Sequence, residues 1–348
     1  MPPYNRPPLS KEFLRGAPQD LLSAESPGWY ERHAVDLLTD ATVVRLDPDE
    51  RRARLSDGRW VQFDRCLLAT GAAARPLPVP GGDGALLLRT LKDAHRIRAA
   101  AAAAGPGAPV LIIGGGLIGV EIASGLAVLG LRPTIVELAG VLWGGSLGEL
   151  LPSWARERLS GVGVTVLLGS TVTALDEEGG WLEERRVPAA FVVAGVGVRP
   201  RDELAAAAGL AVDRGISVGP DQRTSHAAIW AAGDATRMDG RVTEHWHAAR
   251  ESGERAALSM MGIDVGAPRA PWVFTEVAGT SVDIFGAGDA VDHEEWIAEG
   301  RAIARTRDDR LEQLVVIGSA VPAEKARGLV EAKSGMPEVR EALTSLPA

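Results

Sequence analysis

The sequence has only one cysteine, Cys66, in 348 residues. A redox-active pair of cysteines is therefore impossible within one chain, which excludes electron transfer through a protein disulfide. Cys66 stands in an apolar run at residues 66–69, and such a run is typical of a buried strand. We therefore expect Cys66 to be a small residue of a hydrophobic core.

Long apolar segments are also absent. No stretch reaches the roughly 18 consecutive apolar residues that indicate a membrane-spanning helix. Residues 1–11 lack the apolar centre of a secretory signal peptide. We therefore expect a cytoplasmic protein that does not cross a membrane.

Positive charge is scarce, because the formal net charge is -9 and the clusters of Lys and Arg are short. Binding to nucleic acid needs a basic face, so nucleic acid is not expected as the main partner. His245 and His247 are the closest pair of histidines, and no convincing further ligand accompanies them. We therefore expect no metal site.

The composition that remains is that of a packed globular protein, with 46% hydrophobic and 24% charged residues. The length predicts two or three domains. Thr90 and Asp93 predict the capping box of a helix that runs into six alanines, and a Gly- and Pro-rich segment at residues 105–109 ends it. The other predicted elements are an antiparallel layer with strands at 42–46, 53–55 and 60–63, a helix at 146–159, strands at 164–168, 171–175 and 189–194, and a C-terminal α+β module with strands at 282–285, 296–298, 302–305 and 314–317 and a helix from about Pro322.

A glycine-rich motif carries most of the functional information. Residues 114–119 read G-G-G-L-I-G, which fits G-x-G-x-x-G. An apolar strand at residues 110–113 precedes the motif, and a helix at 117–129 and a strand at 133–137 follow it. This order of strand, helix and strand requires a parallel sheet and is the usual setting of a dinucleotide-binding turn.

Each glycine of this motif has a physical role. Gly114 permits the tight turn, Gly116 lets the backbone approach a pyrophosphate, and Gly119 lets the helix pack close to the strand. The phosphates would lie at the positive end of the helix dipole. Glu137 follows about 20 residues on, where a carboxylate accepts both ribose hydroxyls of NAD and repels the extra phosphate of NADP. No Arg follows Glu137 directly, so the sequence predicts NAD(H).

Residues 286–288 contain a second pair of glycines after a predicted strand. The run at residues 289–295 is acidic and polar and has no apolar stripe of helical spacing. We interpret this segment as a turn.

Seven short motifs together resemble the ferredoxin reductase family, whose familiar members are putidaredoxin reductase and rubredoxin reductase. They cover essentially the whole chain in the family's order: residues 4–11 (YNRPPLSK), 68–72 (LATGA), 88–91 (LRTL), the Gly114 motif, 195–200 (GVGVRP), 230–235 (WAAGDA) and 244–246 (EHW). The resemblance implies an α/β fold with two dinucleotide-binding domains and a C-terminal α+β reductase domain. It predicts an FAD-binding domain in two parts, residues 1–92 and 219–266, an NAD-binding domain at 93–218 and the reductase domain at 267–348.

The resemblance also implies roles for individual residues. Lys11 would lie near the flavin ring with Glu121 as its ion-pair partner, and this pair is predicted to be catalytic. Arg89 would hold the FAD pyrophosphate, Asp234 would bind near the ribityl chain or the phosphates, and Trp246 would border the isoalloxazine. The predicted cofactor-binding residues are Arg6, Lys11, Thr70, Gly71, Arg89, Gly114, Gly116, Ile118, Gly119, Glu137, Gly195, Gly197, Gly233, Asp234 and Trp246.

Each of the flavin-site assignments has an ordinary structural alternative. Lys11 is equally explained as a surface charge, and Arg89 as a cation beside a helix. Asp234 is also typical of a helix N-cap, and Trp246 of a core residue.

The sequence departs from the family in two places. The family begins with a further β-α-β unit that holds the ADP part of FAD, and this sequence starts directly at the residue 4–11 motif. Two interpretations stay open: the given sequence starts late, or the protein has lost tight FAD binding. The second departure is at residues 273–277, which read V-F-T-E-V where the family has Phe-Trp-Ser-Asp-Gln.

Three functions follow from these observations. The first is an NADH-dependent FAD reductase, a monomer or homodimer, for a ferredoxin- or rubredoxin-like carrier that serves an oxygenase. The second is a flavin-deficient NAD-binding sensor or partner subunit, and the third is a flavoenzyme for a small molecule. A basic cluster of Arg301, Arg305, Arg307 and Arg310 is interpreted either as a docking surface for an acidic ferredoxin or as a solvated face.

Overall fold

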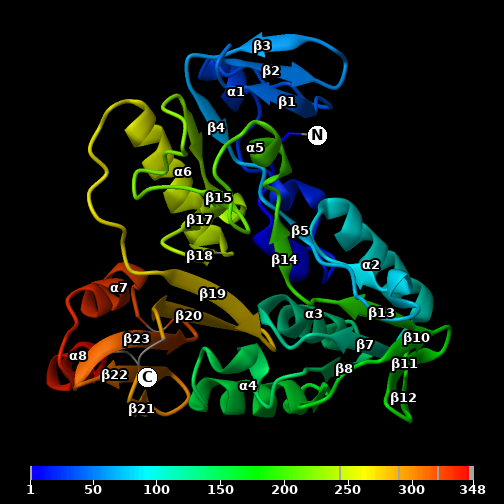
Figure 1. The fold of residues 1–348 in the computed structure, drawn as a ribbon. Helices are drawn as coiled ribbons and strands as arrows, with labels where there is room; N and C mark the ends of the chain where they lie inside the picture. The colour runs from blue at the N-terminus through cyan, green and yellow to red at the C-terminus, as the bar shows by residue number, and fades with distance from the viewer. Residues whose placement is uncertain (1, 243, 289–290, 320, 345–348) are drawn as a thin grey trace. The chain divides into compact units, whose positions relative to one another are not determined.

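The computed structural model describes residues 2–242, 244–288, 291–319 and 321–344 (Figure 1). The chain forms two compact units, each built from three stretches of sequence. The first unit comprises Met1–Asn5, Leu22–Ala73 and Val198–Pro268, and the second comprises Arg6–Leu21, Ala74–Gly197 and Arg269–Ala348. Residues 345–348 of the predicted reductase domain and residues 289–290 of the predicted acidic turn lie outside the described residues.

Small sheets of two or three strands organise the first unit. One is antiparallel in the order β1-β2-β3, one has the order β15-β17-β18, and β4 pairs with β16 in parallel. The elements are β1 (Val43–Asp47), β2 (Arg52–Leu55), β3 (Trp60–Gln62), β4 (Cys66–Leu68), β15 (Ile216–Ser217), β16 (Ile229–Ala231), β17 (Thr236–Met238), β18 (Arg241–Val242), α1 (Trp29–Arg32), α5 (Glu203–Ala207), α6 (Trp246–Met260) and η5 (Gly233–Ala235). The predicted antiparallel layer is thus present as β1 to β3.

The second unit is organised around a five-stranded parallel sheet in the order β6-β13-β7-β8-β9. The elements around it are η1 (Pro7–Ser10), η2 (Gln19–Leu22), η3 (Gly82–Gly84), β6 (Leu86–Leu87), α2 (Leu91–Ala104), β7 (Pro109–Ile113), α3 (Leu117–Val128), β8 (Arg132–Val136), η4 (Leu142–Gly145), α4 (Leu150–Gly161), β9 (Thr165–Leu167) and β13 (Phe191–Ala194). In this sheet β7 lies between β8, which follows it in the chain, and β13, which comes much later, so the strand order reverses at β7. Ligands of open α/β sheets bind at such a reversal of strand order, beyond the carboxyl ends of the strands.

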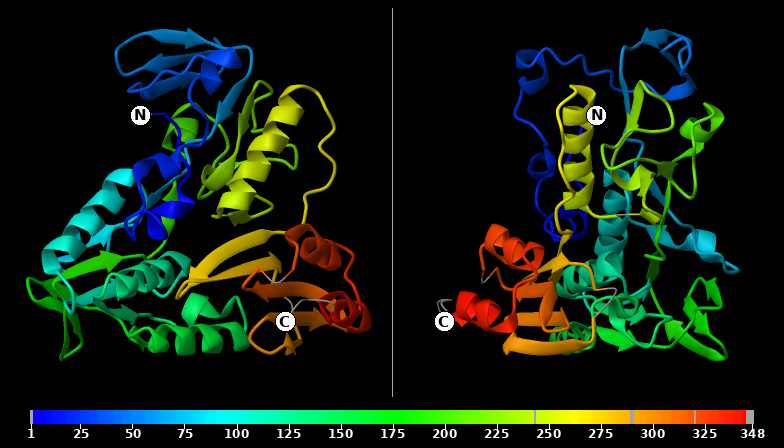
Figure 2. Two further views of the ribbon diagram at one scale, coloured as in Figure 1. Left: turned by 180° about the vertical axis from the view of Figure 1, so that it is seen from behind. Right: turned by 60° about the vertical axis from the view of Figure 1, so that its left-hand side comes forward.

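Two antiparallel sheets complete the second unit. The first is a three-stranded sheet of β10 (Ala174–Asp176), β11 (Gly179–Leu182) and β12 (Arg185–Pro188). The second has the order β19-β20-β23-β22-β21, with β19 (Trp272–Val277), β20 (Thr280–Gly286), β21 (His293–Ala298), β22 (Ala302–Arg307), β23 (Arg310–Ile317), α7 (Ala323–Glu331) and α8 (Met336–Thr344). Figure 2 shows α7 against this sheet, where it packs on β20 and β23. A further two-stranded sheet pairs β5 (Ala72–Ala74) with β14 (Val198–Pro200).

Local sequence explains the elements that frame the parallel sheet. The Thr90 hydroxyl caps α2 and the Asp93 carboxylate accepts the Thr90 backbone N–H, which is the predicted capping box. Gly105, with φ +75°, ends the helix. Residues 110–113 of β7 are all buried, as expected for a parallel strand that is covered on both faces.

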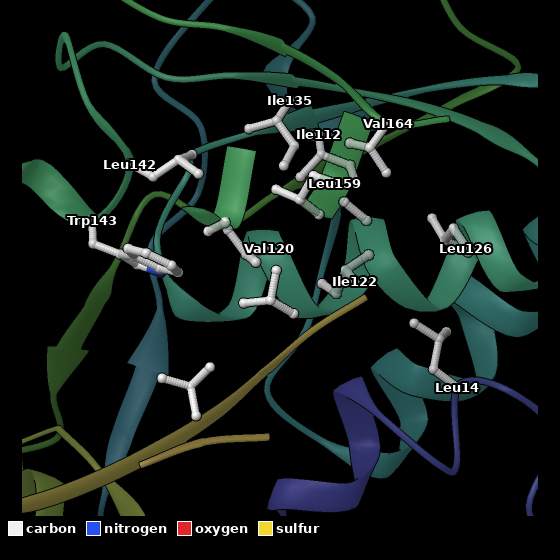
Figure 3. Packing of buried hydrophobic residues seen from close by; sticks show 14 of the residues in the cluster. Leu14, Ile112, Val120, Ile122, Leu126, Ile135, Leu142, Trp143, Leu159 and Val164 are labelled. Carbon is white, nitrogen blue, oxygen red and sulfur yellow. The ribbon is translucent and has the colours of Figure 1, made fainter. Parts of the chain in front are cut away.

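The main hydrophobic core of the second unit joins three stretches of the chain. Ile112 and Ile135 of the sheet pack with Val120, Ile122 and Leu126 of α3 (Figure 3). Leu14, Leu159 and Val282 belong to the same cluster and come from the N-terminal segment, α4 and β20. Because full burial of one such side chain contributes about 1.5–3 kcal/mol, this cluster holds α3 firmly against the sheet.

The predicted helix at 146–159 is shifted in the structure. The helix α4 begins at Leu150, and the 3₁₀ turn η4 precedes it at Leu142–Gly145. The reason is left-handed backbone at Gly148, which has φ +74° and lies inside the predicted helix. Because an α-helix needs negative φ at each residue, Gly148 excludes a helix that begins at residue 146.

Candidate functional site

The motif turn lies between β7 and α3 and depends on two of its glycines. Gly114 has φ +106°, and a Cβ there would be 2.4 Å from the carbonyl oxygen of Gly195. A Cβ on Gly119 would be 2.0 Å from the carbonyl oxygen of Gly114. Both distances are far below contact, so this turn exists only with glycine at the two positions.

Gly116 stands in open space. It is the N-cap residue of α3, its φ of -73° is ordinary, and no side chain caps the helix. A Cβ there would meet no atom within 4 Å. Ile118 in the first turn is 43% exposed although it is large and apolar. The first N–H groups of a helix have no acceptor within the helix itself, and together with the open space at Gly116 they fit a diphosphate group.

Glu137 follows β8 and faces this turn. Its Oε2 accepts the N–H of Gly115 at 2.5 Å, and its Oε1 accepts the N–H of Ala139 at 2.8 Å. A carboxylate has about four acceptor sites, so each oxygen retains one for a further donor. The geometry therefore fits acceptance of two ribose hydroxyls beside the phosphate turn.

The loop after β13 lies beside the motif turn. The N–H of Gly195 donates to the carbonyl of Ile113 at 2.7 Å, which extends the pairing of β13 with β7. Gly197 has φ +94°, and its carbonyl accepts the N–H of Arg75 at 3.0 Å. The structure thus brings the predicted residues Gly114, Gly195 and Gly197 to one edge of the parallel sheet.

A second group of side chains in this unit surrounds Glu121 on α3. The predicted ion pair is present, with 2.8 Å between Lys11 Nζ and Glu121 Oε1. Only 11% of the Lys11 side chain and 3% of the Glu121 side chain are exposed. Lys11 Nζ also lies 5.2 Å from the centre of the Phe274 ring. Burial of both charges excludes the alternative of Lys11 as a surface charge.

Two hydroxyl groups complete the surroundings of this carboxylate. Ser10 Oγ donates to Glu121 Oε2 at 2.5 Å, and Thr275 Oγ1 donates to Glu121 Oε1 at 2.7 Å. Sequence reasoning did not assign these contacts, because the two residues are 111 and 154 positions from Glu121 in the chain. Next to them, Arg15 forms an ion pair with Glu276.

The first unit holds most of the predicted flavin residues. Because β4 and β16 are parallel, their carboxyl ends lie at one edge, and the two glycine loops follow there. Gly71 has φ +68° and Gly233 has φ +74°. Thr70 Oγ1 donates to the carbonyl of Arg201 at 2.6 Å, which fixes the first loop. Two glycine loops at the carboxyl edge of parallel strands fit part of a dinucleotide, such as FAD.

The start of α6 is close to the second of these loops. The N–H of Gly233 donates to Ser252 Oγ of α6 at 2.8 Å, and Trp246 is the first residue of the helix. Burial lowers the pKa of the adjacent His245, although the carboxylates of Asp234 and Glu251 oppose this shift. The predicted residues Gly233, Asp234 and Trp246 therefore belong to one local region.

The remaining predicted residues, Arg6 and Arg89, belong to the second unit. Arg6 is exposed and precedes η1. Arg89 is half-buried just before the α2 capping box, and its backbone N–H donates to Asp93 Oδ2 at 3.2 Å. Their predicted contacts with FAD stay predictions.

The prediction that Arg301, Arg305, Arg307 and Arg310 form one basic surface is wrong, because Arg305 is buried. Arg305 is only 6% exposed, and it donates to Gln313 Oε1 at 2.6 Å and to the carbonyl of Ser146 at 3.0 Å. Arg307 and Arg310 are exposed, and Arg301 is half-buried. The cause is the interior position of β22, which pairs with β23 on one side and β21 on the other, and residues 302–306 of this strand are all buried.

No group of three or more His, Cys, Asp or Glu side chains suited to a metal occurs within the described residues. In the same part of the chain, no helix is long and apolar enough to cross a membrane.

Comparison with known proteins agrees with this geometry. The family model described as pyridine nucleotide-disulphide oxidoreductase matches residues 1–253. The ferredoxin reductase component of a chlorobenzene dioxygenase from Cupriavidus sp. is 33% identical over 97% of this chain and 86% of the relative. The ferredoxin--NAD(+) reductase subunit of a benzene 1,2-dioxygenase system from Pseudomonas putida is 33% identical over 95% of this chain and 84% of the relative.

Among solved structures, the covalent complex of putidaredoxin reductase with putidaredoxin contains a similar chain. It is 26% identical to this chain, with a TM-score of 0.90 over 98% of this chain and 87% of that one. Family model, relatives and fold agree, so the chain belongs to the pyridine nucleotide-disulphide oxidoreductase family.

Proposed function

We propose that this chain is an NADH-dependent flavoprotein reductase, which passes electrons from NADH through FAD to a ferredoxin-type carrier of an oxygenase system. The observation that carries the proposal is the motif turn with open space at Gly116 and the Glu137 carboxylate beside it. The relatives from Cupriavidus sp. and Pseudomonas putida, which are named as ferredoxin reductase components of dioxygenases, support the choice of acceptor.

FAD and NAD(H) are the cofactors of this family, and the residues present fit both. The second unit supplies the diphosphate-binding turn for NADH and Glu137 for the ribose. Thr70, Gly71, Gly233 and Asp234 in the first unit are assigned to FAD, as are Arg6, Arg89 and Trp246. When bound, FAD accepts a hydride from NADH and releases single electrons.

The protein's own contribution is binding and positioning. The α3 N-terminus and the amides of the turn bind the diphosphate, and this fixes where the nicotinamide end lies. Lys11 and Glu121 provide a buried charge pair that we assign to the flavin ring. The single cysteine excludes a disulfide relay within the chain, so the flavin itself has to deliver the electrons.

The proposal also covers the electron acceptor, the localisation and oligomeric state, and the domain boundaries. We favour a ferredoxin over a rubredoxin as the acceptor, because the dioxygenase relatives are named for ferredoxin. We propose a cytoplasmic monomer or homodimer. We also retain the four-part division into FAD-binding, NAD-binding, FAD-binding and reductase segments at residues 1–92, 93–218, 219–266 and 267–348.

The test is electron delivery from NADH to an iron-sulfur protein. The purified chain, with FAD added, is mixed with a [2Fe-2S] ferredoxin, and reduction of the ferredoxin is followed by its absorbance. We expect reduction with NADH, at least about tenfold slower reduction with NADPH, and none without FAD. The variant Glu137→Ala serves as the matched test of the site, and it is expected to raise KM for NADH more than it lowers kcat. Reduction that proceeds equally well without FAD would contradict the proposal.

A further inference from the structure

The carboxylate of Glu121 on α3 is buried and has three hydrogen-bond or ion-pair donors. It is 4% exposed as a residue, and the three donors are Lys11 Nζ, Ser10 Oγ and Thr275 Oγ1. A buried carboxylate with a missing partner costs several kcal/mol, so each donor contributes strongly to the charged form. With three donors on about four acceptor sites, this carboxylate has little freedom to rotate.

The three donors come from parts of the chain that are distant in sequence. Ser10 and Lys11 belong to the N-terminal segment, and Thr275 belongs to β19 of the C-terminal sheet. Ser10 and Thr275 are each 2% exposed, so water does not replace either hydroxyl. The two hydroxyls bind different oxygens of the carboxylate, and this sets the plane in which Oε1 meets the Lys11 ammonium.

The ammonium group has few other strong contacts. Lys11 Nζ donates to the carbonyl of Pro7 at a long 3.4 Å and lies over the Phe274 ring at 5.2 Å. The 2.8 Å contact with Glu121 is therefore its main restraint. Any rotation of the carboxylate displaces the positive charge.

We propose that Ser10 and Thr275 are positioning residues, which fix the Glu121 carboxylate and through it the Lys11 ammonium that the proposed function assigns to the flavin ring. The effect of this ammonium on the flavin rests on the proposed function. The hydrogen bonds from Ser10 and Thr275 to Glu121 do not depend on it. A misplacement of about 1 Å in a reacting array can cost about a hundredfold in rate, so small shifts of the charge matter. The C-terminal sheet thereby contributes, through Thr275, to the hydride-accepting site.

The decisive variant is Thr275→Val, which removes the hydroxyl at nearly constant volume. Thr275→Ser restores the hydroxyl and is the rescue variant, and Ser10→Ala tests the second donor. The matched control is Ser124→Ala, because Ser124 is a buried hydroxyl on the same helix that joins α3 to the residue after β19. Its Oγ donates to the carbonyl of Val120 at 2.8 Å and accepts the N–H of Ala278 at 3.0 Å, so within the described part of the chain both of its hydrogen bonds go to backbone groups and not to the Glu121 carboxylate.

The first measurement uses the chain without flavin and needs no activity. The chain has only four lysines, Lys11, Lys92, Lys325 and Lys333, so their ammonium signals in a nitrogen-15 NMR spectrum are readily assigned with Lys→Gln variants. We expect a resolved Lys11 ammonium signal in the wild type, Thr275→Ser and Ser124→Ala. In Thr275→Val and Ser10→Ala we expect this signal to broaden or vanish, while the Lys333 signal stays.

The second measurement uses the chain with FAD bound. We expect Thr275→Val to slow flavin reduction by NADH about tenfold in stopped flow, with an NAD⁺ dissociation constant within about twofold of the wild type. Ser124→Ala and Thr275→Ser are expected to reduce at the wild-type rate.

The possible results distinguish the positioning role of Ser10 and Thr275 from the proposed function. The inference is wrong if Thr275→Val and Ser124→Ala change the Lys11 signal equally, if Thr275→Val leaves it unchanged, or if Thr275→Ser fails to restore it. A wild-type chain with FAD bound that NADH does not reduce contradicts the proposed function instead, whatever the NMR arm shows.

Discussion

Gly116 is a position where a substitution is expected to change cofactor binding without changing stability. Its φ of -73° suits any residue, and a Cβ there meets nothing within 4 Å. We therefore expect Gly116→Ala to keep the wild-type melting temperature within about 2 °C. Under the proposed function the added methyl group occupies space that the diphosphate of NADH needs, so the NADH dissociation constant should rise at least tenfold, or about 1.4 kcal/mol.

Calorimetric titration with NADH and a thermal melt measure these two properties of Gly116→Ala. The control is Gly328→Ala in α7, which also has open space around its Cβ and is far from the turn in sequence. An unchanged NADH affinity in Gly116→Ala would show that the diphosphate does not approach this turn.

Cys66 is predicted to be chemically inert. Burial raises the pKa of its thiol to about 11 from the ordinary value of 9.0. At pH 8 the reactive thiolate fraction is then about a hundredfold smaller than for a free thiol. We expect iodoacetamide to label the native chain about a hundredfold more slowly than the urea-unfolded chain, as followed by mass spectrometry. Native labelling within about threefold of the unfolded rate would contradict this environment.

At the scale of single residues, the sequence predicted the site unevenly. The glycines of the motif and Glu137 follow from a pattern that is local in the chain, and the structure brings them together. Ser10 and Thr275 have no local signal, because their hydrogen bonds to Glu121 span 111 and 154 positions of the chain. Arg305 misled the prediction of a basic surface, since its burial depends on its place within a sheet.

Among the helices, α6 has an N-cap hydrogen bond whose strength is expected to depend on pH. His245 Nδ1 accepts the N–H of Ala248 at 3.4 Å, and only a neutral imidazole nitrogen accepts a hydrogen bond. Burial lowers the pKa of His245 in the folded chain, against the opposing charges of Asp234 and Glu251. In the unfolded chain its pKa is about 6.5, so the unfolded state binds more protons just below that pH.

The sign of this effect is fixed by the direction of the shift. The contribution of His245 to the free energy of unfolding is fully present above about pH 6.5 and is lost as pH falls from there through the lower folded pKa. The variant His245→Asn keeps an N-cap acceptor without a titrating group. We expect it to match the wild type at about pH 8 and to lose less stability between about pH 6.5 and pH 5, measured by urea unfolding. Equal losses in both chains would contradict the role of His245.

Elements with strong local signals were predicted well. The α2 capping box and its glycine stop are complete within residues 90–105, and the structure has them. The start of α4 was predicted four residues too early, because apolar spacing does not report the left-handed backbone at Gly148. Helix boundaries depend on φ at single residues, whereas periodicity reports an average over several turns.

For the molecule as a whole, the order of motifs was more informative than any one of them. Seven short motifs in family order implied an α/β reductase with two dinucleotide-binding domains, and the family match and the solved structures confirm that fold. Contacts between segments distant in the chain, such as those of β19 with α3, required the structure. The C-terminal sheet therefore contributes to the Glu121 cluster in a way that the sequence did not reveal.

The central claim is that NADH bound at the Gly114 turn passes a hydride to FAD held by the same chain. The most direct test is anaerobic mixing of the FAD-loaded chain with one equivalent of NADH, while the visible absorbance of the oxidised flavin is followed. We expect complete loss of that absorbance within one turnover, and a much slower loss with NADPH or in Gly116→Ala. A flavin that stays oxidised although calorimetry shows NADH bound would contradict the central claim.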